Sequence, residues 1–111
     1  MQKDDVVYLG HMLDMARSAT EKVRGKSRAD FDGDDNLRLA LVHLIQVIGE
    51  AARQVTEPTR QQYPEIPWKD IVGMRHRVVH DYMHVDFDVV WEVAAADLPG
   101  LVKALEKIVC E

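Results

Sequence analysis

The most hydrophobic segment of the chain, "NLRLALVHLIQVIGEAARQV" at residues 36–55, most constrains what the chain can fold into. Its apolar residues recur every three or four positions, which is the period of an α-helix and not the alternation of a strand. One stripe consists of Leu37, Leu41, Leu44, Ile48, Ala52 and Val55. Four more apolar residues make the face wider than core packing requires: Leu39, Val42, Ile45 and Val47. We predict a helix that is either central or shared with a partner.

A narrow polar strip runs along the same segment. It consists of His43, Gln46, Glu50 and Arg53, at steps of three, four and three residues. Charged side chains normally face solvent, so an exposed strip is the simpler interpretation. The alternative is that the strip borders an active cleft. In that case Glu50 supports the cleft, although a surface ion pair with Arg53 explains it equally well.

The segments before this helix also favour helical structure. Residues 4–24 place apolar side chains at three- and four-residue steps and form one stripe. The acidic segment at residues 28–35 lies where the positive end of the following helix dipole is expected. Asp34 or Asp35 should therefore cap that helix. These patterns predict an all-α fold.

The second half of the chain is divided by prolines. Residues 57–68 contain three prolines and should form a short helical turn followed by an extended connector. A new helix should begin there and cover residues 68–83. A last helical pattern, over residues 87–108, is interrupted at Pro99, where we expect a kink or a restart capped by Asp97.

Length and composition predict one folded domain over residues 1–111. The chain is 47% hydrophobic and 30% charged, the balance of a soluble globular protein. Its one cysteine, Cys110, excludes an internal disulfide and a cysteine-type zinc site. No apolar run approaches the roughly 20 residues that cross a bilayer, and the start lacks a signal-peptide pattern. We expect a cytoplasmic protein that is neither exported nor embedded in a membrane.

The charge is distributed unevenly. A net charge of −5 argues against a general nucleic-acid coat, because such proteins neutralise many phosphates with Lys and Arg. Residues 69–84 are the least acidic polar region, with three basic residues and three histidines against two aspartates. Contact with a phosphate is therefore most plausible in that region.

The stretch "GMRHRVVHDYMH" at residues 73–84 concentrates the titratable groups. On a continuous helix His76, His80 and His84 would share one edge, the spacing of a histidine metal site. Known helical zinc motifs add a carboxylate or a third ligand at a fixed place, and the stretch contains no glutamate. Asp81 or Asp86 would have to complete the site, so we favour no metal and no cofactor.

Arg75 and His80 suggest phosphodiester chemistry instead. A guanidinium binds phosphate oxygens in a planar fork and stabilises the added charge of a pentavalent transition state. A histidine that titrates near neutrality can accept the proton of a 2′-hydroxyl or donate one to the leaving oxygen. On a helix the two side chains diverge by about 140°, but the long arginine stem could reach an imidazole near the helix end.

Tyr82 would share the arginine's face, two helical turns further on. Its phenol could stack on a base, donate a hydrogen bond to phosphate or serve as an attachment point. From spacing alone, a polar helix end with ordinary salt bridges explains the whole stretch equally well.

The order Arg75, four residues, His80, one residue, Tyr82 resembles the RX4HXY signature of the HepT-like toxins in the HEPN superfamily of helical ribonucleases. The resemblance extends over most of the chain. It includes "IGEAA" at 48–52, "YPEIPWKDIVGMRHRVVHDY" at 63–82, "VDFDVVW" at 85–91 and "DLPGL" at 97–101.

This resemblance implies an up-and-down HEPN-type bundle of four to five main helices. It also implies a homodimer in which two motifs face one cleft, in agreement with the wide apolar face of residues 36–55. The activity it implies is metal-independent cleavage of RNA, not DNA. Arg75 would bind phosphate and His80 would be the general acid/base. HepT-like proteins often have asparagine after the arginine, where this chain has His76, which could add a second phosphate contact.

The implied partner is an antitoxin, a nucleotidyltransferase of the MNT type that transfers AMP from ATP to the motif tyrosine. Tyr82 would be that acceptor. An alternative from another class is a non-catalytic module that docks the nucleotidyltransferase or a nucleotide, using Arg75 and His80 only for binding. We favour the ribonuclease, because a scaffold would not need all three motif residues.

Overall fold

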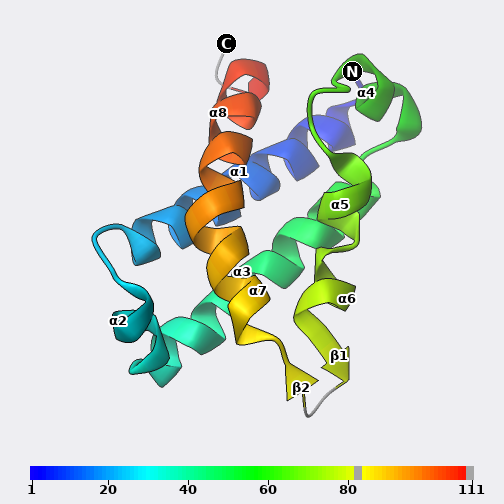
Figure 1. The fold of residues 1–111 in the computed structure, drawn as a ribbon. Helices are drawn as coiled ribbons and strands as arrows, with labels where there is room; N and C mark the ends of the chain where they lie inside the picture. The colour runs from blue at the N-terminus through cyan, green and yellow to red at the C-terminus, as the bar shows by residue number, and fades with distance from the viewer. Residues whose placement is uncertain (82–83, 110–111) are drawn as a thin grey trace.

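Three long helical segments build an all-α bundle (Figure 1). They are α1 (Lys3–Val23), α3 (Asp35–Gln54) and one continuous run of α7 (Phe87–Glu92), the π-helical turn η1 (Val93–Asp97) and α8 (Leu98–Val109). α1 and α3 run in opposite directions, and α1 also packs against α8. The structure, a computed structural model, describes residues 1–81 and 84–109, with the backbone alone at His80 and Asp81. Where four to five main helices were expected, these three segments are long and the other described helices are short.

The core lies where the three long segments meet. Its fully buried side chains include Leu9, Met12, Leu13, Leu41, Ile45, Ile48, Leu98 and Leu105. The predicted ranges of the first two long helices are confirmed to within a few residues. Within the described part of the chain, every helix is too short or too polar to cross a bilayer.

The start of α3 confirms the predicted cap. The Asp34 side chain accepts a hydrogen bond from the Leu37 N–H at 3.0 Å. Such a bond satisfies one of the helix's unpaired N–H groups and places negative charge at the positive end of its dipole.

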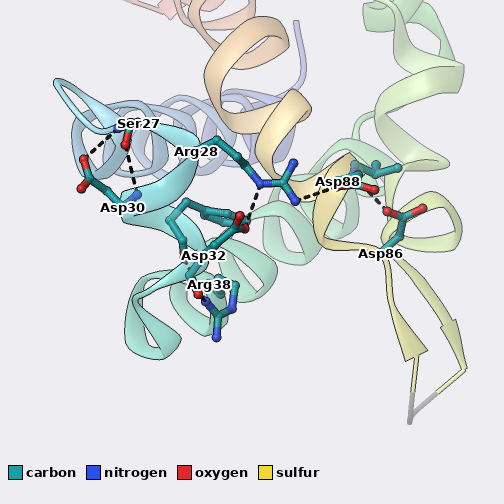
Figure 2. A network of polar contacts seen from close by, with 9 residues as sticks. Ser27, Arg28, Asp30, Asp32, Arg38, Asp86 and Asp88 are labelled. Atoms are coloured by element: carbon teal, nitrogen blue, oxygen red, sulfur yellow. Dashed lines mark hydrogen bonds and ion pairs between the residues drawn. The ribbon is translucent and has the colours of Figure 1, made fainter.

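A short helix, α2 (Arg28–Asp32), was not predicted by the hydrophobic pattern. It begins with a reciprocal capping box, in which the Ser27 hydroxyl accepts from the Asp30 N–H and the Asp30 carboxylate accepts from the Ser27 N–H. The bond from the Ser27 N–H lowers the pKa of Asp30. Figure 2 shows Arg28 reaching from α2 to Asp88 on α7. The acidic segment thus joins two helices as well as preceding one.

The single helix predicted over residues 68–83 is wrong. α5 (Trp68–Val72) stops at Gly73, α6 (Met74–Val78) follows, and β1 (Val79–Asp81) then pairs antiparallel with β2 (His84–Val85). The adjacent β-branched residues Val78 and Val79 favour extended backbone over helix. In addition, the Val78 carbonyl accepts from the Asp86 N–H at 2.7 Å and so does not continue the helical ladder.

The last segment continues through Pro99 without a restart. The Leu98 N–H donates to the Val93 carbonyl, five residues earlier, and this wider turn accommodates the proline, which clashes in a regular helix. The predicted irregularity is thus present, but the predicted cap is wrong because Asp97 lies inside η1. Asp86 instead caps α7, accepting from the Val89 N–H at 3.2 Å.

Asp5 fastens α1 to the start of α4 (Glu57–Gln62). The residue is 1% exposed, and its carboxylate accepts from the Thr56 N–H at 2.9 Å and from the Thr56 and Thr59 hydroxyls at 2.6 Å each. Burial on its own raises the pKa of the Asp5 carboxylate, but the hydrogen bonds from Thr56 and Thr59 outweigh it and hold the pKa below its ordinary value.

Candidate functional site

Arg75 lies at a small hollow between α3 and the α5–α6 segment, which we name the α3–α6 hollow. Its volume is about 220 Å³, and it is lined by Gly49, Glu50, Arg53, Val72, Gly73, Arg75 and His76. Three residues that the sequence proposed for the site, Arg75, His76 and Glu50, therefore lie at one place. Two residues of the polar strip of α3, Glu50 and Arg53, line this hollow.

Apolar anchors on α5 and α6 fix which way the basic residues face. Ile71, Met74 and Val78 are buried, whereas Arg75 and His76 are exposed. Trp68 holds the start of α5, since its indole N–H donates to the carbonyls of Tyr63 and Arg60 at 3.0 and 3.1 Å. The arginine and the histidine are therefore presented at the surface by a segment whose opposite face is anchored in the core.

Two glycines allow the backbones to approach at this hollow. A Cβ atom at Gly49 would lie 3.2 Å from the Ile71 carbonyl oxygen, so a larger residue would push α5 away from α3. A Cβ atom at Gly73 would lie 3.2 Å from the Lys69 carbonyl oxygen. A lone glycine inside a strongly apolar helix was the available signal for this close approach, and the sequence interpretation did not use it.

Positive charge dominates the hollow. Two guanidinium groups and an imidazole face one carboxylate, that of Glu50. Glu50 pairs with Arg53 at 3.9 Å, and both side chains are more than half exposed. The Arg75 guanidinium has no hydrogen bond or ion pair with any residue whose side chain is described. The hollow is therefore suited to bind an anion, through a planar guanidinium fork that matches phosphate.

Other hollows are larger than the α3–α6 hollow. One of about 410 Å³, between α5–α6 and α8, has three carboxylates at its rim, from Glu65, Asp70 and Asp97. Another of about 630 Å³ lies beside α1 and α8 and is lined by four cationic side chains and two carboxylates. Two of those four cations are already paired, Arg17 with Glu106 at 2.7 Å and Arg24 with Glu21 at 3.1 Å. The α3–α6 hollow is therefore distinguished from these two by neither size nor net charge but by Arg75, whose guanidinium has no carboxylate partner among the described side chains.

The remaining motif residues follow α6. The backbone of His80 lies in β1, directly after the helix that carries Arg75, and its side chain is outside the described part of the structure. Tyr82 also lies outside the described residues. His84 is on β2.

The helical end of α6 removes the arguments that assumed a longer helix. The shared edge of His76, His80 and His84 does not exist, because α6 ends at Val78. The common helical face of Arg75 and Tyr82 fails for the same reason. Among side chains that the structure describes, no group of three His, Cys, Asp or Glu residues is placed to hold a metal ion.

Similar proteins carry ribonuclease names. The profile of the family described as "Ribonuclease HepT-like" matches residues 12–108. A protein named "Putative RNase" from Caldanaerobacter subterraneus subsp. tengcongensis is 35% identical over 101 residues, covering 91% of this chain and 90% of the relative. A similarly named Methanocaldococcus jannaschii protein is 36% identical over 110 residues, covering 98% and 95%. "Probable ribonuclease HepT" from Thermococcus cleftensis is 29% identical over 108 residues, covering 97% and 98%. No solved structure matches the chain significantly.

Proposed function

Because the chain belongs to the HepT-like ribonuclease family, we propose that it is an endoribonuclease whose active site is the α3–α6 hollow together with His80. The observation that carries this proposal is the exposed Arg75 guanidinium, which shares a cationic hollow with His76 and is followed within five residues by His80. We further propose that the protein acts as the toxin of a toxin–antitoxin pair.

The proposed reaction needs no metal. Arg75 binds the scissile phosphate and stabilises the charge that develops on its oxygens. His80 accepts the proton of the adjacent 2′-hydroxyl, and the 2′-oxygen forms a bond to phosphorus. The bond between phosphorus and the 5′-oxygen breaks, and that oxygen takes up a proton from an imidazolium or from water. The products are a 2′,3′-cyclic phosphate and a 5′-hydroxyl. His76 adds a second phosphate contact, and Glu50 supports the site from α3.

Cleavage of RNA in the presence of EDTA tests this assignment. We expect the purified, unmodified protein to cleave, and His80→Ala to reduce the rate by about 10²- to 10⁴-fold. Full cleavage by both His80→Ala and Arg75→Ala would exclude these residues as catalysts. Loss of wild-type cleavage in EDTA would indicate a metal-dependent reaction. Binding of RNA without any cleavage would favour the alternative, a non-catalytic module that docks a nucleotide or a nucleotidyltransferase.

A homodimer through α3 is part of the proposal. Of the residues that widen the apolar face of α3, Ile45 is buried in the core, Val42 and Val47 are half-buried, and Leu39 remains 65% exposed. An exposed leucine beside half-buried valines is the kind of surface that a second subunit covers. Light scattering coupled to gel filtration should give a dimer mass, and Leu39→Asp should shift it towards the monomer. A monomeric wild type would contradict this arrangement.

The proposed partner is a nucleotidyltransferase antitoxin that modifies Tyr82. The Tyr82 phenol oxygen attacks the α-phosphorus of ATP, a tyrosyl–AMP bond forms, and pyrophosphate leaves with the electrons of the broken bond. A bulky anionic group seven residues after Arg75 would fill the site and repel the RNA phosphate. Intact-mass analysis after co-expression with such an enzyme should show AMP-sized increments that map to Tyr82. Their absence, or their location elsewhere, would contradict this mode of inactivation.

A further inference from the structure

We propose that Arg53 and Glu50 form a second phosphate subsite in the α3–α6 hollow. Arg53 binds the RNA phosphate next to the one held by Arg75, and Glu50 holds the Arg53 guanidinium when no RNA is bound. This inference rests on the proposed function for the identity of the ligand, a single-stranded RNA backbone. It adds a binding residue that the RX4HXY signature does not contain.

The position of Arg53 supports this subsite. Arg53 comes from α3 and Arg75 from α6, yet both line the same hollow of about 220 Å³. Gly49 lets α3 approach the α5 backbone closely, and α6 follows α5 directly, so both arginines lie on this side of the bundle. Two guanidinium groups from different elements can bind two successive phosphates of one strand, whereas a single flexible arginine fixes only one.

Charge is the second argument. Arg53, Arg75 and His76 place two fixed positive charges and one titratable group around a single carboxylate. The hollow therefore carries a net positive charge, which an entering phosphate would offset. The one carboxylate that offsets this positive charge is that of Glu50, which lies 3.9 Å from the Arg53 guanidinium. The side chains of Glu50 and Arg53 are 52% and 64% exposed. An exposed ion pair of this kind contributes little, so Arg53 can leave Glu50 for a phosphate that accepts two parallel hydrogen bonds.

Size and lining indicate which part of the RNA enters. Pockets that enclose a drug-sized ligand measure about 300–1,000 Å³, and this hollow measures about 220 Å³. Its lining contains no Phe, Tyr or Trp ring. The hollow is therefore sized for the sugar–phosphate backbone rather than for a base, and guanidinium contacts to phosphate position the strand without reading its sequence.

Binding to an uncleavable strand tests the subsite separately from catalysis. The probe is a fluorescent single-stranded oligoribonucleotide with 2′-O-methyl groups on every ribose, because it lacks the proposed nucleophile. Fluorescence anisotropy is measured with full-length wild type, Arg53→Ala, Glu50→Gln and Arg24→Ala over a series of salt concentrations. Arg24 is a matched control, since it is an exposed arginine that pairs with a glutamate three residues earlier, as Arg53 does, and it lines the hollow beside α1 and α8 instead of the α3–α6 hollow.

We expect Arg53→Ala to weaken binding about tenfold and to reduce the slope of log K against log salt by about 0.7, the value for one single-strand phosphate contact. Glu50→Gln should strengthen binding, since it releases Arg53, and Arg24→Ala should leave affinity unchanged. Against cleavable RNA, Arg53→Ala should raise KM and leave kcat nearly unchanged. Equal melting temperatures of the variants exclude a folding effect.

Affinity and salt slope of Arg53→Ala equal to those of Arg24→Ala would overturn the subsite, and weaker binding by Glu50→Gln would overturn the role of Glu50. The result is independent of catalysis. If the wild type fails to cleave RNA, the proposed function fails while a specific loss of binding in Arg53→Ala still supports the subsite. If cleavage depends on Arg75 but Arg53→Ala binds RNA as the wild type does, the proposed ribonuclease function is supported and the Arg53 subsite is contradicted.

Discussion

Arginines in two regions of this molecule have opposite surroundings. At the α2–α7 junction Arg28 donates to Asp32 at 2.9 Å and to Asp88 at 2.6 Å, and these hydrogen bonds raise its pKa (Figure 2). At the α3–α6 hollow Arg75 has no such partner among the side chains that the structure describes. Arg28 is engaged in ion pairs, one of which joins α2 to α7, whereas the Arg75 guanidinium is available to bind a ligand. The presence or absence of carboxylate partners thus distinguishes a structural arginine from one that can bind a ligand.

Removing Arg75 should produce the largest effect, confined to activity. We expect Arg75→Ala to lower kcat by about 10²- to 10³-fold, because it loses a group that stabilises transition-state charge. Its melting temperature should equal that of the wild type, since no described contact is lost. Cleavage assays and thermal unfolding of the same preparation measure both. A large fall in melting temperature with an unchanged cleavage rate would instead give Arg75 a structural role.

Asp5 provides the strongest case of a charged group that acts only in the fold. We expect Asp5→Ala to lower the free energy of unfolding by about 2–3 kcal/mol, because a buried carboxylate that accepts three hydrogen bonds is removed. Urea unfolding measures this loss. Below the new melting temperature kcat should match the wild type, and a catalytic defect there would contradict the separation of roles.

The same carboxylate gives stability a predictable pH dependence. Because the pKa of Asp5 is lower in the folded protein than in the unfolded chain, its stabilisation is fully present above the unfolded value. It is lost as the pH falls through the folded value. The stability difference between wild type and Asp5→Asn should therefore be constant above about pH 5 and shrink progressively as the pH falls below it. A difference that grows with acidification would contradict the lowered pKa.

Gly49 tests how far the hollow depends on close helix packing. Gly49→Val should cost about 1–3 kcal/mol of unfolding free energy, because the new side chain overlaps the α5 backbone at Ile71. It should also reduce RNA binding, since α5 and α6 must shift. Gly10 in α1 is the matched control, since a Cβ atom there meets nothing within 4 Å. Gly10→Ala should raise stability by about 0.5–1 kcal/mol. Chemical denaturation compares the two variants, and equal costs would contradict the packing argument.

The smallest effect is expected at the junction itself. Arg28→Ala should lower stability only slightly, because its ion pairs are exposed, although its guanidinium also lies 5.5 Å from the Phe31 ring centroid. Cleavage should be unchanged. The stability loss should diminish in high salt, as it does for exposed ion pairs. A loss of activity without a loss of stability would assign Arg28 to the same class as Arg75.

The sequence was sufficient for the long helices, because their stripes extend over many turns. α1 and α3 were predicted nearly to the residue. Asp34 was one of two aspartates predicted as the cap of α3, because negative charge is favourable at the positive end of the helix dipole. α2 was missed because its signal is a four-residue capping box and not a periodic stripe. The π-helical turn before Pro99 could be predicted only as an irregularity, since several backbone shapes relieve the same clash.

The helix predicted over residues 68–83 is interrupted by a short antiparallel pairing that the periodic pattern does not reveal. The sequence there continues a helical pattern, but the Val78 carbonyl accepts a hydrogen bond from the Asp86 N–H, eight residues later. Predictions that placed residues on either side of Val78 on one face of a helix therefore have no helical basis. Arg75, His76 and Glu50 were proposed from residue chemistry and resemblance, and these proposals did not depend on that helix. Arg53 was left unassigned, because a polar strip on one helix does not reveal which element packs beside it.

The most direct test of the proposed RNA cleavage by Arg75 and His80 is the chemistry of the new RNA ends, determined by mass spectrometry after digestion in EDTA. Attack by the 2′-oxygen predicts a 2′,3′-cyclic phosphate on one product and a 5′-hydroxyl on the other. A single 2′-deoxyribose at the cleaved position should abolish cutting there. Products with a 5′-phosphate and a 3′-hydroxyl, or undiminished cutting at the deoxyribose, would contradict the proposed mechanism.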